Sequence, residues 1–170
     1  MVFCKAQDNY ATTQFGVDIP EVALLNLKSS SEVILNPLTP AEAGLSLDFT
    51  EARSTDVWIN YSSVLAGNRV ARNISAAVEG EIPEGVVLKV IASPDAGFGG
   101  GQMGTPVGEV TLSNTMQPVI SGIGSCYTGV GVNKGCMLTY FLELNDKTAY
   151  SGIQDKSYTL TVLFTLGDEE

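Results

Sequence analysis

The stretch Tyr158-Thr-Leu-Thr-Val-Leu-Phe-Thr-Leu166 carries the pattern on which the fold prediction rests. Apolar residues alternate with threonines along it, and a period of two is typical of a β-strand with one buried face. The apolar positions that share this face are Tyr158, Leu160, Val162, Phe164 and Leu166. Leu163 is apolar on the opposite face, which favours a strand covered on both sides. The stretch therefore predicts a strand packed against a core.

Similar runs recur along the chain between turns rich in Gly, Pro and Asn. They lie at residues 15–19, 22–27, 31–35, 56–61, 73–78, 86–92, 109–112, 117–121 and 137–144. Residues 39–44 have helical composition but suffice for only one turn. About eight short strands predict a single antiparallel β-sandwich, Ig-like or fimbrial-like, over residues 7–170, with a β-barrel as the alternative. The turn residues at 80–85 further predict a hairpin between the runs at 73–78 and 86–92.

The composition argues against several classes of function. The net charge is −10, from 19 acidic and 9 basic residues, so we expect no binding to nucleic acid. No apolar run reaches the roughly 18 residues of a membrane span, so we expect no membrane insertion. The chain contains no histidine, which excludes Ser-His-Asp and Cys-His catalysis and histidine-based zinc sites. We therefore expect a protein that is not an enzyme.

The first residues, Met1-Val-Phe-Cys-Lys-Ala6, have features of a secretory signal. Cys4-Lys5-Ala6 has the spacing of a signal-peptidase site, and the apolar residues before it fit the end of a hydrophobic region. Residues 1–6 are therefore predicted to be a signal-peptide remnant. The alternative is a short apolar start without targeting meaning.

Cys126 and Cys136 lie in a glycine-rich segment between two strand-like runs. The glycines let the chain fold back, so the cysteines are predicted to face each other on neighbouring strands and form a disulfide. A disulfide favours an oxidising compartment. The alternative is a pair of free thiols in a cytosolic protein.

Phe15, Val17 and Ile19 alternate with polar residues and glycine near the start of the chain. They fit either the first strand of the sandwich or a strand donated to a neighbouring subunit. The first interpretation is favoured, because the strand at residues 158–166 looks complete without an external partner.

Several sequence motifs are better explained by a structural role than by binding, catalysis or modification. Gly99-Gly-Gly101-Gln-Met-Gly104 matches a dinucleotide-binding pattern. Such a site needs a helix after the glycines, but a strand-like run follows here, so no cofactor is expected. Residues 95–108 are instead predicted to form a long flexible loop that crosses one end of the sandwich. Asp48, Glu51 and Asp56 fit solvated surface, with a carboxylate pair for sugar hydrolysis or a Ca²⁺ site as alternatives. The glycosylation sequons at Asn60 and Asn73 lie inside predicted strands and are interpreted as chance matches.

Trp58 is the single tryptophan and falls within the run at residues 56–61. It is expected on a sheet face or in the core, with a sugar-stacking platform as the alternative.

The processed N-terminus, the strands rich in Thr and Gly, the single predicted disulfide and the final alternating strand resemble secreted fimbrial-subunit and spore-coat-U-like proteins of Gram-negative bacteria. The resemblance implies a non-catalytic β-sandwich subunit, assembled at the cell surface or into an extracellular fibre. The expected function is a structural or adhesin-like module that associates with itself by β-strand addition or binds a surface glycan. The alternative is an extracellular carbohydrate- or Ca²⁺-binding module that uses the loops at residues 95–108 and 128–134.

Overall fold

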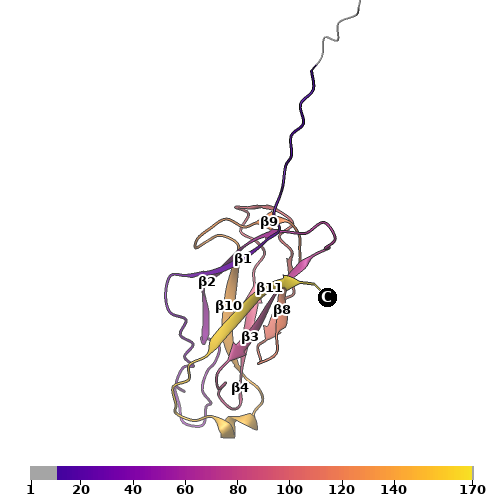
Figure 1. Cartoon of the computed structure of the whole chain (residues 1–170). Coiled ribbons are helices and arrows are strands. Elements are labelled where there is room, and N and C mark those ends of the chain that lie inside the picture. The colour runs from indigo at the N-terminus through magenta and orange to yellow at the C-terminus, as the bar shows by residue number, and fades with distance from the viewer. Residues whose placement is uncertain (1–10, 170) are drawn as a thin grey trace, which may run out of the picture.

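The computed structural model describes residues 11–169, whose strands form two antiparallel sheets packed face to face (Figure 1). The first sheet contains β1 (Val22–Ser29), β2 (Arg53–Val64), β4 (Val86–Ala92), β5 (Gly100–Gly101), β7 (Glu109–Thr111), β9 (Cys126–Tyr127) and β10 (Cys136–Leu144). The second contains β3 (Arg72–Glu79), β6 (Thr105–Pro106), β8 (Gln117–Ile123) and β11 (Thr161–Asp168). A single turn of 3₁₀ helix, η1, spans Ala149–Gly152. The predicted β-sandwich is confirmed, and the described strands form no closed barrel.

The strand order of the first sheet is β5-β9-β2-β10-β4-β7, and that of the second is β11-β3-β8-β6. β1 pairs with residues 57–64 of β2, while β10 pairs with residues 53–59 of the same strand. Because these ranges overlap, β1 and β10 lie on opposite edges of β2. β1 is therefore the outermost strand on its side of the first sheet.

The core consists of the inward-facing side chains of both sheets. In β4 and in the first part of β3, buried residues alternate with partly exposed ones, as one buried sheet face requires. The most deeply buried large side chains are Ile59, Ile74, Ile120, Ile123 and Leu138. Each contributes roughly 1.5–3 kcal/mol through removal of its apolar surface from water.

The predicted hairpin across residues 80–85 is wrong, because β3 and β4 belong to different sheets. Six residues of extended chain can span about 20 Å, and packed sheets lie about 10 Å apart. The segment is therefore long enough to carry the chain from one sheet to the other. Alternation identifies a strand but does not say which strand pairs with it.

The sequence also predicted that the last strand is buried on both faces, and this prediction is wrong for one face. Leu163 of β11 is 44% exposed, while Val162, Phe164 and Leu166 on the other face pack against the core. The regular strand begins at Thr161, so Tyr158 and Leu160 precede it. Among the described residues, no helix is long and apolar enough to cross a membrane.

Candidate functional site

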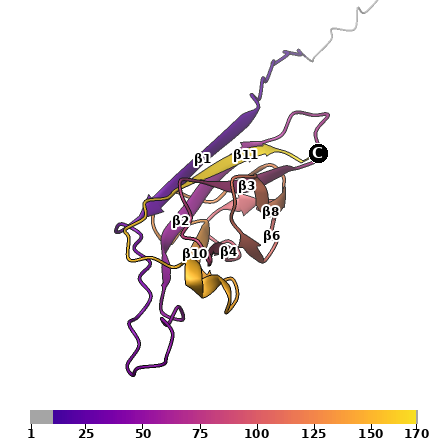
Figure 2. The same ribbon diagram turned by 90° about the horizontal axis from the view of Figure 1, so that it is seen from below.

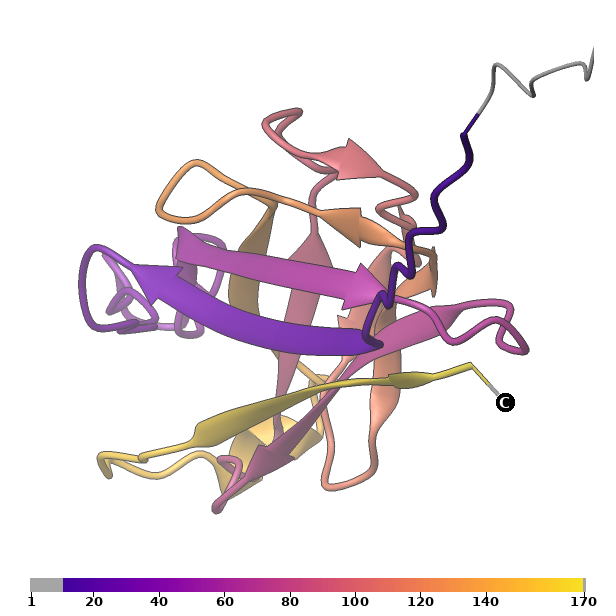
Figure 3. The ribbon, with the colours of Figure 1, turned by 45° about the horizontal axis from the view of Figure 1, so that its top comes forward.

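The candidate site lies on the side of the sandwich that carries β1 and β11. The two strands run side by side on this side of the molecule (Figure 2), and they contact each other. They come close where Val22 begins β1 and Asp168 ends β11, and they diverge toward their other ends (Figure 3). Within residues 11–169, β1 pairs only with β2 and β11 only with β3, so each has an unpaired edge.

An apolar groove of about 1190 Å³ occupies the region where the two strands diverge. Its floor is formed by core residues of the first sheet, namely Val57, Leu88, Tyr140 and Leu142. Its walls come from residues 31–37, after β1, and from residues 153–158, before β11. The run at residues 31–35, predicted as a strand, forms one of these walls without strand structure. The groove thus lies over the core between two strand edges that lack partners, and its partly exposed apolar lining includes Leu27, Val33 and Leu160.

The segment before β1 extends away from the sandwich as an arm, defined here as residues 11–20 (Figure 1). Phe15, Val17 and Ile19 belong to this arm and are 85%, 83% and 73% exposed. The first strand of the sandwich is β1, and residues 11–20 have no strand structure of their own. Three alternating apolar side chains are therefore left in solvent, at the end of the molecule where β1 begins.

A cluster of ion pairs fixes the base of this arm. Glu21 contacts both Arg69 and Arg72, and the same two arginines contact Asp168 at the end of β11. The Arg69 Nε to Glu21 Oε1 distance is 3.6 Å, and the Arg72 Nε to Asp168 Oδ1 distance is 3.5 Å. The cluster therefore joins the start of β1 to the end of β11.

Arg72 is the buried member of this cluster, with a side chain only 4% exposed. Its Nη1 donates to the backbone oxygen of Val22 at 2.5 Å and to Ser63 Oγ at 3.0 Å. A buried guanidinium is costly unless its donors find acceptors, and besides these Nη1 contacts Nη2 donates to Glu21 and Nε faces Asp168. Sequence reasoning did not identify this cluster, because its members lie at residues 21, 69, 72 and 168 and share no local motif.

The predicted disulfide between Cys126 and Cys136 is absent, and both cysteines are free and buried. Cys126 lies opposite Ser63 and Cys136 opposite Ile59, so the two are four positions apart along the same edge of β2. At about 3.3 Å per residue their separation is about 13 Å, beyond the roughly 7 Å that a disulfide tolerates between Cα atoms. The predicted hairpin is therefore wrong: β9 and β10 run in the same direction along β2, with residues 129–135 looping out between them.

An asparagine holds this loop in place of the expected disulfide. Asn60 accepts a hydrogen bond from the Gly131 N–H at 2.8 Å and donates to the Lys134 backbone oxygen at 2.6 Å. Asn60 is 5% exposed, so its glycosylation sequon is buried in the fold. The second sequon, at Asn73, lies within β3.

The two thiols lie in a setting that suppresses their reactivity. Burial raises the pKa of both Cys126 and Cys136 to about 11. The hydroxyl of Tyr61 lies 3.8 Å from the sulfur of Cys136 and donates to the Met103 backbone oxygen at 2.6 Å. Burial also raises the pKa of Tyr61 well above its ordinary value. Because a thiolate is the nucleophilic form, both cysteines are weak nucleophiles at neutral pH.

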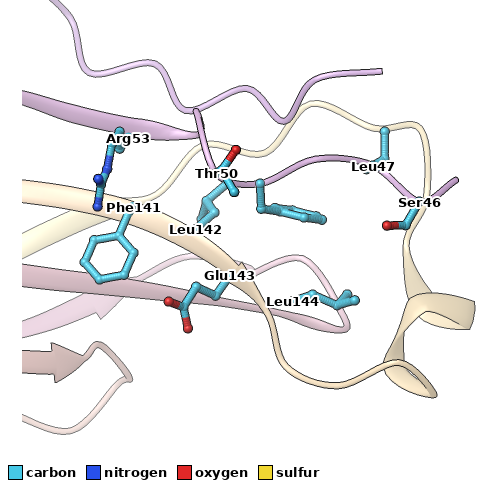
Figure 4. Close-up of a pocket in the computed structure, with 9 residues that line it drawn as sticks. Ser46, Leu47, Thr50, Arg53, Phe141, Leu142, Glu143 and Leu144 are labelled. Carbon is cyan, nitrogen blue, oxygen red and sulfur yellow. The ribbon is translucent and has the colours of Figure 1, made fainter. Parts of the chain in front are cut away.

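A smaller pocket of about 490 Å³ lies between residues 46–50 and β10 (Figure 4). Arg53 lies next to Phe141 in this pocket, with its guanidinium carbon 5.5 Å from the ring centroid. Glu143 at the pocket edge accepts a hydrogen bond from Lys89 Nζ at 2.6 Å. The acidic group of the pocket is therefore already paired, and the lining offers packing more than acid–base chemistry.

The glycines at residues 99–101 allow the backbone to pack closely against a neighbouring strand. β5 pairs with β9, and a Cβ on Gly99 would lie 1.7 Å from the Tyr127 backbone oxygen. Gly101 has a φ of +98°, which side chains rarely adopt. Residues 95–108 do cross between the sheets, but strand pairing through β5 and β6 holds them.

Asp48 and Asp56, interpreted as solvated surface with a catalytic pair or a Ca²⁺ site as the alternatives, each accept hydrogen bonds from other residues. Asp48 accepts hydrogen bonds from the backbone and hydroxyl of Thr50, which lower its pKa. Asp56 accepts a hydrogen bond from Ser31 Oγ at 3.1 Å. In the part of the chain that the structure describes, no group of three or more Cys, Asp or Glu side chains could hold a metal.

Trp58 lies on the outer face of the first sheet, a position that fits both the sheet-face and the sugar-stacking interpretations. It is partly exposed and lies between Lys28 of β1 and Met137 of β10.

The signal-peptide interpretation of residues 1–6 falls outside the described residues. No protein family, curated protein or solved structure matches this chain.

Proposed function

We propose that this protein is a secreted, non-enzymatic structural or adhesin-like subunit that joins other copies of itself into a bacterial surface or extracellular fibre. Each copy donates arm residues 14–19 as a strand to the groove of the next. The observation that carries the proposal is the pairing of two incomplete features in one chain: an apolar groove between unpaired strand edges and an exposed arm with alternating apolar residues.

The arm has the chemical pattern that the groove requires. An inserted strand can pair its backbone with the free edges of β1 and β11, which supplies affinity without sequence preference. Phe15, Val17 and Ile19 then lie on one face of that strand, because side chains two residues apart point the same way. This face covers the apolar floor of the groove, while Gly16 and Asp18 face outward.

The placement of the two features favours a chain of subunits over a closed pair. The arm leaves from the end where β1 begins, whereas the groove lies toward the end where β1 and β11 diverge (Figures 1 and 3). A contact between different surfaces of two copies is heterologous, and such contacts form open filaments unless a rotation closes them into a ring. Head-to-tail donation therefore suits a fibre.

The chemistry of the side chains supports a structural over a catalytic function. Histidine is absent from the sequence, and the thiols of Cys126 and Cys136 are buried with raised pKa values. The resemblance to fimbrial-subunit and spore-coat-U-like proteins adds an expected location outside a Gram-negative cell.

The test is concentration-dependent assembly, followed by sedimentation velocity and negative-stain microscopy. Wild-type protein should form elongated oligomers, and Val17→Asp should weaken their association by at least about tenfold, since burying one valine contributes about 1.5 kcal/mol or more. Gln14→Asp is the matched control, because it adds the same charge to the face of the arm that points away from the groove. A wild-type protein that stays monomeric at all concentrations would overturn the proposal, as would equal effects of the two substitutions.

A further inference from the structure

We infer that the base of the arm is built to keep the arm from folding back along the free edge of its own β1, so that the strand can be given only to another copy. Arg72 is the residue that enforces this choice. The inference rests on the proposed function for its biological meaning, but the position of the arm in a single molecule can be measured separately.

The faces of β1 follow from its pairing with β2. Leu25 lies opposite Tyr61 and Leu27 opposite Ile59, and both β2 residues are buried in the core. Odd-numbered residues of β1 therefore share the inner face of the sheet, and even-numbered residues share the outer face. Leu24, which is 66% exposed, agrees with this assignment.

The shortest fold-back of the arm onto β1 has the wrong register. A two-residue turn at Pro20 and Glu21 pairs Ile19 with Val22 and Val17 with Leu24, on the outer face. The apolar side chains of the arm would then point to solvent, and Asp18 would point toward the core. A shift of one residue moves every side chain of a strand to the opposite face, so this hairpin cannot fill the groove.

Pro20 opposes the same hairpin through its backbone. Two-residue hairpins favour type I′ and II′ turns, which need a positive φ at the first turn residue. The proline ring holds φ near −65° and so prevents this conformation.

A turn one residue longer would restore the correct register. With residues 20–22 as the turn, Ile19 pairs with Ala23 and Val17 with Leu25, on the inner face. Pro20 is acceptable at the first position of such a turn, because a three-residue loop begins with a type I turn. This hairpin is therefore the fold-back that the chain has to prevent.

Arg72 holds the two residues that this longer turn would need to move. It contacts the Glu21 carboxylate and donates to the Val22 backbone oxygen, which keeps Val22 in β1 opposite Val64. Ser63 and Asp168 anchor the same guanidinium from other strands. Forming the turn would break the contacts of Glu21 and Val22 with a buried arginine, so the arm points away from the sandwich.

The experiment uses a release variant of the full chain, Glu21→Asn with Val22→Gly. It removes the carboxylate and places glycine at the third turn position, where a left-handed conformation is needed. Hydrogen exchange is measured at concentrations where the protein is monomeric. In the wild type, the amides of residues 14–19 should exchange as in an unstructured chain, and in the release variant they should be protected at least about tenfold. Glu42→Asn, a neutralisation at an exposed residue in a loop, should behave as the wild type.

The release variant should also fail to assemble at concentrations where the wild type does, because its own arm occupies the edge of β1 that an incoming strand would pair with. If the release variant does not fold, Glu21→Gln alone should raise protection of the same amides by a smaller factor. Arm amides that exchange as fast in a folded variant as in the wild type would overturn the inference, and so would a wild-type monomer whose arm is already protected. A wild type that never assembles, with a free arm that becomes protected in the variant, would overturn the proposed function and support this inference.

Discussion

Raising the pH from 8 to 10 should destabilise the protein through its two buried thiols. In the folded chain burial raises the pKa of Cys126 and Cys136 from about 9 to about 11, whereas unfolding returns both to water. Above about pH 9 the unfolded chain therefore binds fewer protons than the folded one, and the free energy of unfolding falls as the pH rises. The thiols have no such effect below about pH 9, and the loss is complete above about pH 11.

The size of the effect follows from the two pKa values. At pH 10, one unit above the unfolded pKa, each thiol lowers the free energy of unfolding by about 1.4 kcal/mol, and the pair by about 2.7 kcal/mol. A domain of this kind has a total stability of roughly 5–15 kcal/mol, so the change is well within measurement.

The assay is urea denaturation at pH 8, 9 and 10, followed by the fluorescence of Trp58. The double substitution Cys126→Ala, Cys136→Ala provides the reference, because burial is the main cause of the raised pKa of Tyr61 and remains in the variant, so the contribution of Tyr61 largely cancels in the difference. Between pH 8 and pH 10 the wild type should lose about 2.7 kcal/mol more than the variant. Equal losses of unfolding free energy in both proteins would refute the reasoning. A wild-type mass lower by two hydrogens would then show that Cys126 and Cys136 form the disulfide that the sequence predicted.

Two further substitutions test the packing around β9. Gly99→Ala should destabilise the protein by about 2 kcal/mol or more in thermal unfolding, because the added Cβ would lie 1.7 Å from the Tyr127 backbone oxygen. The control is Gly67→Ala, which should be nearly neutral because the space around Gly67 is open. Asn60→Ala should cost about 1–3 kcal/mol and speed hydrogen exchange at residues 129–135, since it removes both hydrogen bonds that hold the loop. The exposed Asn26→Ala is its control, and an unchanged loop in Asn60→Ala would show that Asn60 does not hold it.

The sequence allowed most strands to be located but not paired. The runs at residues 56–61, 73–78, 86–92 and 137–144 all lie within strands, because their alternation is a local property of the chain. Pairing depends on residues far away in sequence, and here the prediction failed twice. Residues 80–85 cross between the sheets, and residues 129–135 loop out before the chain returns to the same edge of β2.

Only part of the candidate site could be predicted from the sequence. Phe15, Val17 and Ile19 could be singled out, because their alternation and the polar residues before them are local features. The groove and the arginine cluster could not, since their residues come from distant segments and become neighbours only when both sheets form. The apparent completeness of the strand at residues 158–166 was misleading for the same reason: a single strand does not reveal whether its outer edge has a partner.

By itself, then, the sequence determined the all-β class, the lack of histidine chemistry and the apolar pattern of the arm, because composition and periodicity are properties of the chain. Only the tertiary structure decided that the cysteines are about 13 Å apart, since the register along β2 sets that distance. It also decided that β1 and β11 have unpaired edges and that Arg72 fixes the base of the arm. These features depend on which strand edges meet, and that is settled by the packing of the whole core.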